Sequence, residues 1–82
     1  MNNIVSNIDK IHTTELGIKR IKKNLNIDGD AVEYIKKYLL DSRCLIYKRG
    51  KNYYCEINNI IITINSYNFS IITAHIIDKN KI

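Results

Sequence analysis

The stretch Cys44–Asn65, CLIYKRGKNYYCEINNIIITIN, decides the fold, because its apolar residues recur at a period of two. Breaks of two residues at Gly50–Lys51 and Asn58–Asn59 divide it into three runs. Two-residue connections between alternating runs are typical of antiparallel β-hairpins. The stretch therefore predicts three antiparallel strands, at about residues 44–49, 52–57 and 60–65.

The residues that follow add a fourth strand. After a short turn at Ser66–Asn68, the alternation resumes in FSIITAHII and predicts a strand at about residues 69–77. Each connection is too short to cross over the sheet, so each strand should pair with the next. The expected sheet is a four-stranded antiparallel meander within residues 44–77.

Before residue 41 the apolar residues follow helical spacing instead. Thr13 and Asp30 are the expected N-caps of the second and third helices. The predicted helices span about residues 3–11, 14–25 and 30–40. The chain is thus expected to form a single α+β domain over residues 1–82, in which about three N-terminal helices, within residues 3–41, pack on one face of the sheet.

Hairpin pairing sorts the strand residues onto two faces, because residues opposite each other share a face. We take Asn65 to pair with Phe69 in the last hairpin. The first face is apolar apart from Lys48 and Ser70, and it should pack against the helices. It holds Cys44, Ile46, Tyr53, Cys55, Ile57, Ile60, Ile62, Ile64, Ile72, Ala74 and Ile76.

The second face mixes aromatic, hydroxyl, acidic and basic groups and should stay open, because buried polar groups would need partners. It holds Leu45, Tyr47, Arg49, Tyr54, Glu56, Ile61, Thr63, Asn65, Phe69, Ile71, Thr73 and His75. Its cross-strand rows are Glu56–Ile61–Thr73 and Tyr54–Thr63–Ile71, with His75 diagonal to Ile61. We expect Thr73 and His75 to line a groove with Glu56, Thr63 and Arg49.

Composition restricts the function. The net charge of +5 favours polyanions such as RNA, although lysines spread along the chain also suit a generic basic protein. No secretion signal or apolar run long enough for a membrane span is visible, so a cytoplasmic protein with reduced thiols is expected. The sequence holds no nucleotide-, cofactor- or metal-binding motif, and we expect neither a cofactor nor a metal.

The second face carries groups suited to metal-independent RNA cleavage. His75 and Glu56 are candidate acid–base groups, with Thr73 beside them, and Arg49 and Lys51 are candidate phosphate ligands. Tyr47, Tyr54 and Phe69 could stack on bases, and Thr63 is a further candidate for RNA binding. A half-exposed strand histidine and ordinary cross-strand aromatic packing remain the simpler alternatives.

A second candidate group precedes the second helix. His12, Thr13 and Thr14 stand at its N-terminus, where exposed backbone amides favour an anion. Together with Arg20 they could form a phosphate cradle, with His12 as a further catalytic candidate. Plain helix capping, with Arg20 solvated, is the alternative.

At HTTELGIKRIKKNL, GKNYYC and IITINSYNFSIITAHII the chain resembles a family of short bacterial domains of unknown function. Helices followed by a meander that ends in IITAH also look like the barnase–EndoU–colicin–RelE group of ribonuclease folds. That resemblance implies active residues from the helical segment and the open sheet face. The matching positions here are His12, Thr14, Arg20, Thr63, Thr73 and His75.

Two functions are therefore expected to compete. The first is a small RNA-directed protein, in the form of a metal-independent endoribonuclease of toxin or phage type. The second is a non-catalytic module that binds nucleic acid or protein, such as a phage-encoded inhibitor of a host defence or regulatory protein. An antitoxin or a host target would be the protein partner.

Overall fold

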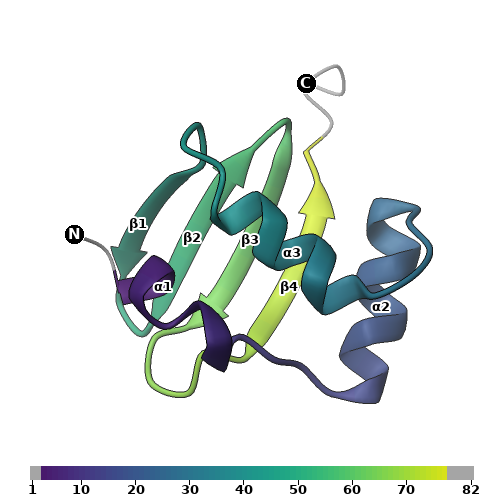
Figure 1. The fold of residues 1–82 in the computed structure, drawn as a ribbon, viewed down its shortest axis with the longest axis horizontal. Helices are drawn as coiled ribbons and strands as arrows, with labels where there is room; N and C mark the ends of the chain where they lie inside the picture. The colour runs from purple at the N-terminus through teal and green to yellow at the C-terminus, as the bar shows by residue number, and fades with distance from the viewer. Residues whose placement is uncertain (1–2, 78–82) are drawn as a thin grey trace.

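The computed structural model describes residues 3–77, and within them the fold is α+β, as predicted. Four strands form one antiparallel sheet in the order β1-β2-β3-β4, preceded by the helices (Figure 1). The elements are α1 (Asn3–Ser6), the 3-10 turn η1 (Ile8–Lys10), α2 (Glu15–Leu25), α3 (Ala31–Leu39), β1 (Leu45–Arg49), β2 (Asn52–Ile57), β3 (Ile60–Asn65) and β4 (Ile71–Ile76).

The first two hairpins have the registers that their turns predict. Asn58 and Asn59 both have positive φ, 50° and 64°, as a type I′ turn requires. Gly50 has φ 64° at the first position of the other two-residue turn. The bounds of β2 and β3 match the prediction, whereas β1 begins one residue later than predicted, at Leu45.

The helices differ from the prediction mainly at their starts. Thr14, and not Thr13, caps α2 by accepting from the Gly17 amide at 3.0 Å. Asp30 caps α3 as predicted, accepting from the Glu33 amide at 3.1 Å. The predicted first helix is instead α1 followed by η1, and they are separated at Asn7.

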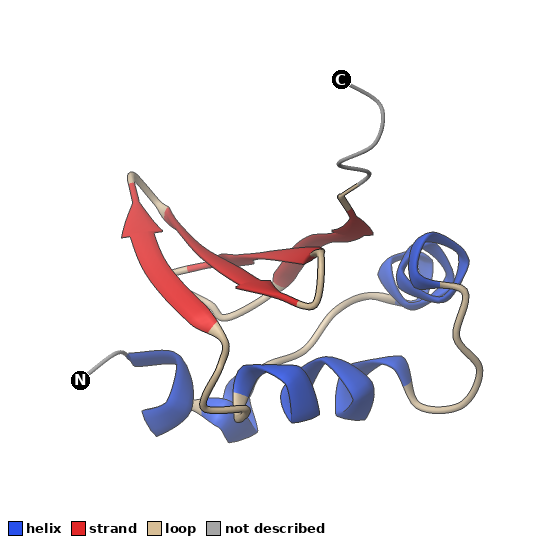
Figure 2. Cartoon of the chain, turned by 90° about the horizontal axis from the view of Figure 1, so that it is seen from above, coloured by secondary structure: helices blue, strands red, loops and turns tan. Residues whose placement is uncertain are grey.

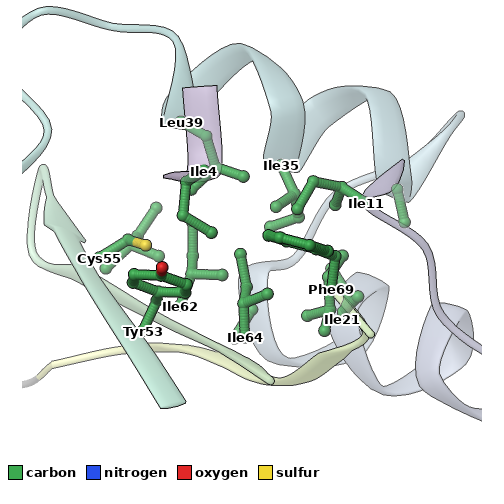
Figure 3. Close-up of a cluster of buried hydrophobic side chains, with 14 of the residues drawn as sticks. Ile4, Ile11, Ile21, Ile35, Leu39, Tyr53, Cys55, Ile62, Ile64 and Phe69 are labelled. Atoms are coloured by element: carbon green, nitrogen blue, oxygen red, sulfur yellow. The ribbon is translucent and has the colours of Figure 1, made fainter. Parts of the chain in front are cut away.

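One face of the sheet, the core face, is covered by α3 together with α1 and η1 (Figure 2). The isoleucines of β3 on this face, Ile60, Ile62 and Ile64, are buried as predicted. Ile62 and Ile64 pack in one cluster with Ile35 and Leu39 of α3 (Figure 3). At ~1.5–3 kcal/mol for each buried aliphatic side chain, this cluster explains why the helices cover this face and not the other.

Both cysteines lie on the core face as free thiols, as the pattern predicted. Cys55 is fully buried, and Cys44 is partly buried against the same cluster. A hydrogen bond between the two thiols lowers the pKa of Cys44, while the same contact and burial raise the pKa of Cys55.

The last strand corrects the predicted register. Ile61 pairs with His75 and Thr63 with Thr73, and the register then shifts so that Ile64 pairs with Ile71. At the turn, the Asn65 amide donates to the Ser70 carbonyl at 2.9 Å, so the pairing starts one residue later than predicted, and this slip turns Phe69 and Ile71 to the opposite face. The β-bulge at Ile72 then adds a second residue, so Thr73 and His75 keep the predicted face but lie two positions away from the predicted pairing. The prediction that Phe69 and Ile71 lie on the open face is therefore wrong, because both are buried in the core.

Two isoleucines of β4 that were predicted to be buried are exposed, one because of the bulge and one because it ends the strand. Ile72, the extra residue, is 48% exposed, and Ile71 takes its place in the core. Ile76 lies opposite Ile60 on the core face, but it stands at the end of β4 and is 51% exposed. Only Ala74 among the three β4 residues assigned to this face is buried.

The outer edge of β4 is closed by the segment that leads into α2. His12 forms a parallel bridge with Ser70, in which the Ile71 amide donates to the His12 carbonyl at 2.8 Å. The Thr13 hydroxyl donates to the Ile71 carbonyl at 3.3 Å, and Asn24 of α2 donates to the Ala74 carbonyl at 3.2 Å. Helix α2 therefore lies beside the sheet edge, next to β4 (Figure 2).

The corrected register predicts opposite outcomes for two isoleucines. Ile62→Ala should lower the free energy of unfolding by ~2–5 kcal/mol, because its side chain is fully buried. Ile72→Ala should lower it by less than ~1 kcal/mol, because its side chain is half exposed. Urea denaturation of both variants measures this difference, and equal losses would contradict the bulge.

Candidate functional site

The face of the sheet opposite the helices, the open face, carries two cross-strand rows. One row is Tyr47–Tyr54–Thr63–Thr73 and the other is Leu45–Glu56–Ile61–His75. The predicted rows were correct across β2 and β3 but wrong at β4. His75, and not Thr73, completes the row of Glu56, and Thr73, and not Ile71, completes the row of Tyr54.

The two tyrosines of the first row form an aromatic pair. The rings of Tyr47 and Tyr54 stack with centroids 5.7 Å apart and planes 25° apart. The Tyr47 hydroxyl donates to Glu56 Oε2 at 2.9 Å, which links the two rows. This hydrogen bond to the carboxylate raises the pKa of Tyr47 and holds Glu56 in place.

The remaining predicted residues of the open face differ in exposure. Thr63 is only 8% exposed although the helices lie on the opposite side of the sheet, so neighbouring side chains enclose it (Figure 2). Thr73 and His75 are exposed. Arg49 is exposed at the end of β1, and Lys51 is exposed in the adjoining turn.

A cavity of about 160 Å³, here called the edge cavity, lies between α2 and β4. This volume is about ten times the ~10–15 Å³ that one water molecule needs, so a group of several atoms fits. Its polar lining comes from Thr13, Thr14, Arg20, Asn24, Ser70 and Thr73. Thr14 and Arg20 of one predicted group and Thr73 of the other thus line the same cavity.

His12 is not part of the lining of the edge cavity. Its Nδ1 lies 2.8 Å from the Lys10 carbonyl oxygen. Because a carbonyl oxygen only accepts, Nδ1 is the donor, and Nε2 of the neutral ring is left as an acceptor. The backbone of His12 closes the β4 edge, which is a structural role that its sequence position did not predict.

Glu56 also lines a second cavity, separate from the edge cavity. That cavity lies around the β2–β3 turn and includes Leu45 and Asn58. The predicted acid–base residues therefore lie on the open face, and the predicted phosphate residues divide between the edge cavity and the β1–β2 hairpin.

Two polar residues that line the edge cavity were missed by the sequence analysis, Asn24 and Ser70. Asn24 stands four residues after Arg20, and Arg20 three after Gly17, so all three share one face of α2. That spacing could have revealed Asn24. Ser70 could not have been found, because the register before the bulge decides where it points.

Among residues 3–77, no group of three or more His, Cys, Asp or Glu side chains is placed to hold a metal ion. In the same range, no helix is both long and apolar enough to cross a membrane.

These features define a small α+β protein whose antiparallel sheet is covered on one face and carries polar and aromatic rows on the other. The chain belongs to a family described as a protein of unknown function, DUF3781, whose model matches residues 5–75. This confirms the resemblance to a domain family without known activity. No curated protein and no solved structure matches the chain, so the likeness to the ribonuclease fold group stays a prediction.

Gly17 has a specific role at the edge cavity. A Cβ at this position would collide with the Thr13 hydroxyl, the group that donates to the Ile71 carbonyl. Gly17→Ala should therefore destabilise the protein, even though alanine favours a helix by ~1 kcal/mol over glycine. On a Thr13→Ala background the same change should destabilise clearly less, because only the tight contact of 3.2 Å with the Cβ of residue 13 remains. Urea unfolding of the four proteins measures the coupling, and equal effects on both backgrounds would refute it.

Proposed function

We propose that the protein binds single-stranded RNA across the open face. The observation that carries the proposal is the row Tyr47–Tyr54–Thr63–Thr73, which runs over all four strands and ends at the edge cavity. Strands lie ~4.8 Å apart, so the row spans ~14 Å, room for a few nucleotides. Sheet aromatics that stack on unpaired bases are a common mode of RNA binding.

The aromatic pair would bind bases. Because Tyr47 and Tyr54 stack on each other, one face of each ring is occupied by its partner. The exposed part of Tyr47, 37% of the residue, is available for a base to stack on. Such stacking is worth ~1–3 kcal/mol per base and tolerates any base.

The edge cavity would bind a phosphate. Arg20, which carries a guanidinium group, and Thr14 and Thr73, which carry hydroxyl groups, are among its lining residues. These are groups that commonly contact phosphate oxygens in nucleic-acid complexes. Arg49 and Lys51 at the opposite side of the sheet, with the net charge of +5, support further phosphate contacts.

Binding can be measured by fluorescence anisotropy with a labelled oligouridine. Tyr47→Ala should raise Kd roughly 5- to 150-fold, from the loss of ~1–3 kcal/mol of stacking. Tyr67→Ala is the matched control, because Tyr67 is 76% exposed in the turn before β4. An equal loss in both variants, or no binding by the natural protein, would exclude this site.

The phosphate contact has a separate signature. Arg20→Ala should weaken binding and reduce the slope of log K against log salt by ~0.7, the value for one phosphate contact on a single strand. Lys37→Ala, which removes an exposed charge from α3, should leave the slope unchanged. If the two substitutions change the slope equally, the edge cavity holds no phosphate.

The row Leu45–Glu56–Ile61–His75 favours RNA cleavage as a further candidate function. Glu56 and His75 lie on the same row with Ile61 between them, so their strand positions are ~10 Å apart. Long side chains at that separation can reach the two sides of one phosphodiester. Glu56 would remove the proton from the 2′-hydroxyl, whose oxygen attacks phosphorus, and the His75 imidazolium would protonate the departing 5′-oxygen.

The products of this reaction identify it. We expect cleavage of total RNA in EDTA to leave a 2′,3′-cyclic phosphate and a 5′-hydroxyl. His75→Asn should abolish cleavage and leave oligouridine affinity nearly unchanged, whereas Tyr67→Ala should retain both. Cleavage that survives His75→Asn, or the absence of cleavage at high protein concentration, would leave an RNA-binding protein without this activity.

A further inference from the structure

The two edge strands of the sheet differ in the hydrogen bonds that cover their outer sides. The β4 edge is closed by backbone and side-chain hydrogen bonds from His12, Thr13 and Asn24. For β1, the other edge strand, β2 is its only neighbour in the sheet formed by residues 3–77. An uncovered edge presents a row of backbone donors and acceptors to any extended chain.

The hairpin geometry shows which backbone groups are free. Arg49 and Asn52 flank a two-residue turn, so they form a hydrogen-bonded pair. Bonded pairs alternate along an antiparallel ladder, which makes Tyr47–Tyr54 the next bonded pair. Lys48 and Ile46, on either side of Tyr47, therefore belong to non-bonded pairs, and their backbone N–H and C=O groups point away from the sheet.

The side chains of β1 form an apolar part followed by a basic part. Leu45 is 60% exposed and Tyr47 is 37% exposed. Lys48 and Arg49, both exposed, follow them, and Lys51 stands in the turn. A partner strand would thus meet apolar groups at one end and positive charge at the other.

Neighbouring acids do not neutralise this basic part. Asp41 is paired with Arg43 at 2.9 Å, and that contact lowers the pKa of Asp41 to about 2. Glu56 accepts the hydrogen bond from Tyr47, and within residues 3–77 it lies in no ion pair with Lys48, Arg49 or Lys51. Lys48, Arg49 and Lys51 are therefore available to a negatively charged partner.

We propose that β1 is a docking edge for an extended acidic segment of a protein partner, which adds a fifth strand to the sheet. In an antiparallel arrangement, two acidic residues would lie opposite Arg49 and Lys48, and three apolar residues would follow opposite Tyr47, Ile46 and Leu45. Backbone bonds to Ile46 and Lys48 supply affinity, and the side chains supply specificity.

A second copy of the chain fits this edge less well. Two chains of charge +5 repel each other. Antiparallel pairing centred on Tyr47 would also place Lys48 and Arg49 opposite Ile46 and Leu45 of the second copy, so neither basic residue would face an acidic one. A lysine on an edge strand is a common device against such self-pairing. The same lysine attracts an acidic strand.

The probe is a fluorescein-labelled peptide in which two glutamates precede three valines. Its matched control carries N-methyl groups on the residues whose amides would face β1, which removes the backbone donors and keeps every side chain and charge. Fluorescence anisotropy should show saturable binding of the probe, and a Kd at least tenfold higher for the control. Equal affinity of the two peptides would overturn the proposal.

Two variants test the edge from the protein side. Lys48→Pro removes an outward N–H at a position that an edge strand tolerates, and Lys48→Glu keeps the backbone and reverses the charge. Both should raise the Kd of the probe at least fivefold, whereas Lys37→Ala should not change it. Unchanged affinity in both Lys48 variants would overturn the proposal. So would a concentration-dependent dimer of the natural protein, seen by sedimentation, that Lys48→Pro abolishes.

Discussion

Burial of the isoleucine face of β3 is the constraint on which the rest of the structure depends. The helices within residues 3–77 cover one face of the sheet and one of its edges. Ile60, Ile62 and Ile64 make one face the more favourable to bury, and α3 with α1 and η1 occupies it (Figure 2). The opposite face stays open as a consequence, and the rows through Tyr54 and Glu56 remain accessible.

Because α3 already fills the centre of the core face, α2 takes a different position, beside β4. There two carbonyls of the β4 edge accept hydrogen bonds, one from Asn24 of α2 and one from Thr13 in the segment before it. The same placement forms the edge cavity between α2 and β4, where Gly17 leaves room for the Thr13 hydroxyl. Protection of one edge and formation of a polar cavity thus have a single structural cause, and β1 is left as the edge available to a partner.

Most of the fold could be predicted because it depends on local signals. The bounds of β2 and β3 follow from alternation between two-residue turns, and the cap at Asp30 follows from its own side chain. The candidate site could be predicted only in part. The side chains on β1, β2 and β3 fell on the expected rows, whereas the partners contributed by β4 did not. The register of β4 depends on a turn one residue longer than predicted and on the bulge at Ile72, and the local pattern signals neither.

The sequence by itself determined the fold class, the open and covered faces of the first three strands, and the polar, aromatic and basic residues available to a site. Those features depend on periodicity and turn chemistry, which act over a few residues. The tertiary structure alone decided that Phe69 and Ile71 enter the core, that His75 shares a row with Glu56, and that Arg20 meets Thr73. Each of these requires contact between segments far apart in the chain, where packing against α2 and the core selects one register among several that local pattern permits equally.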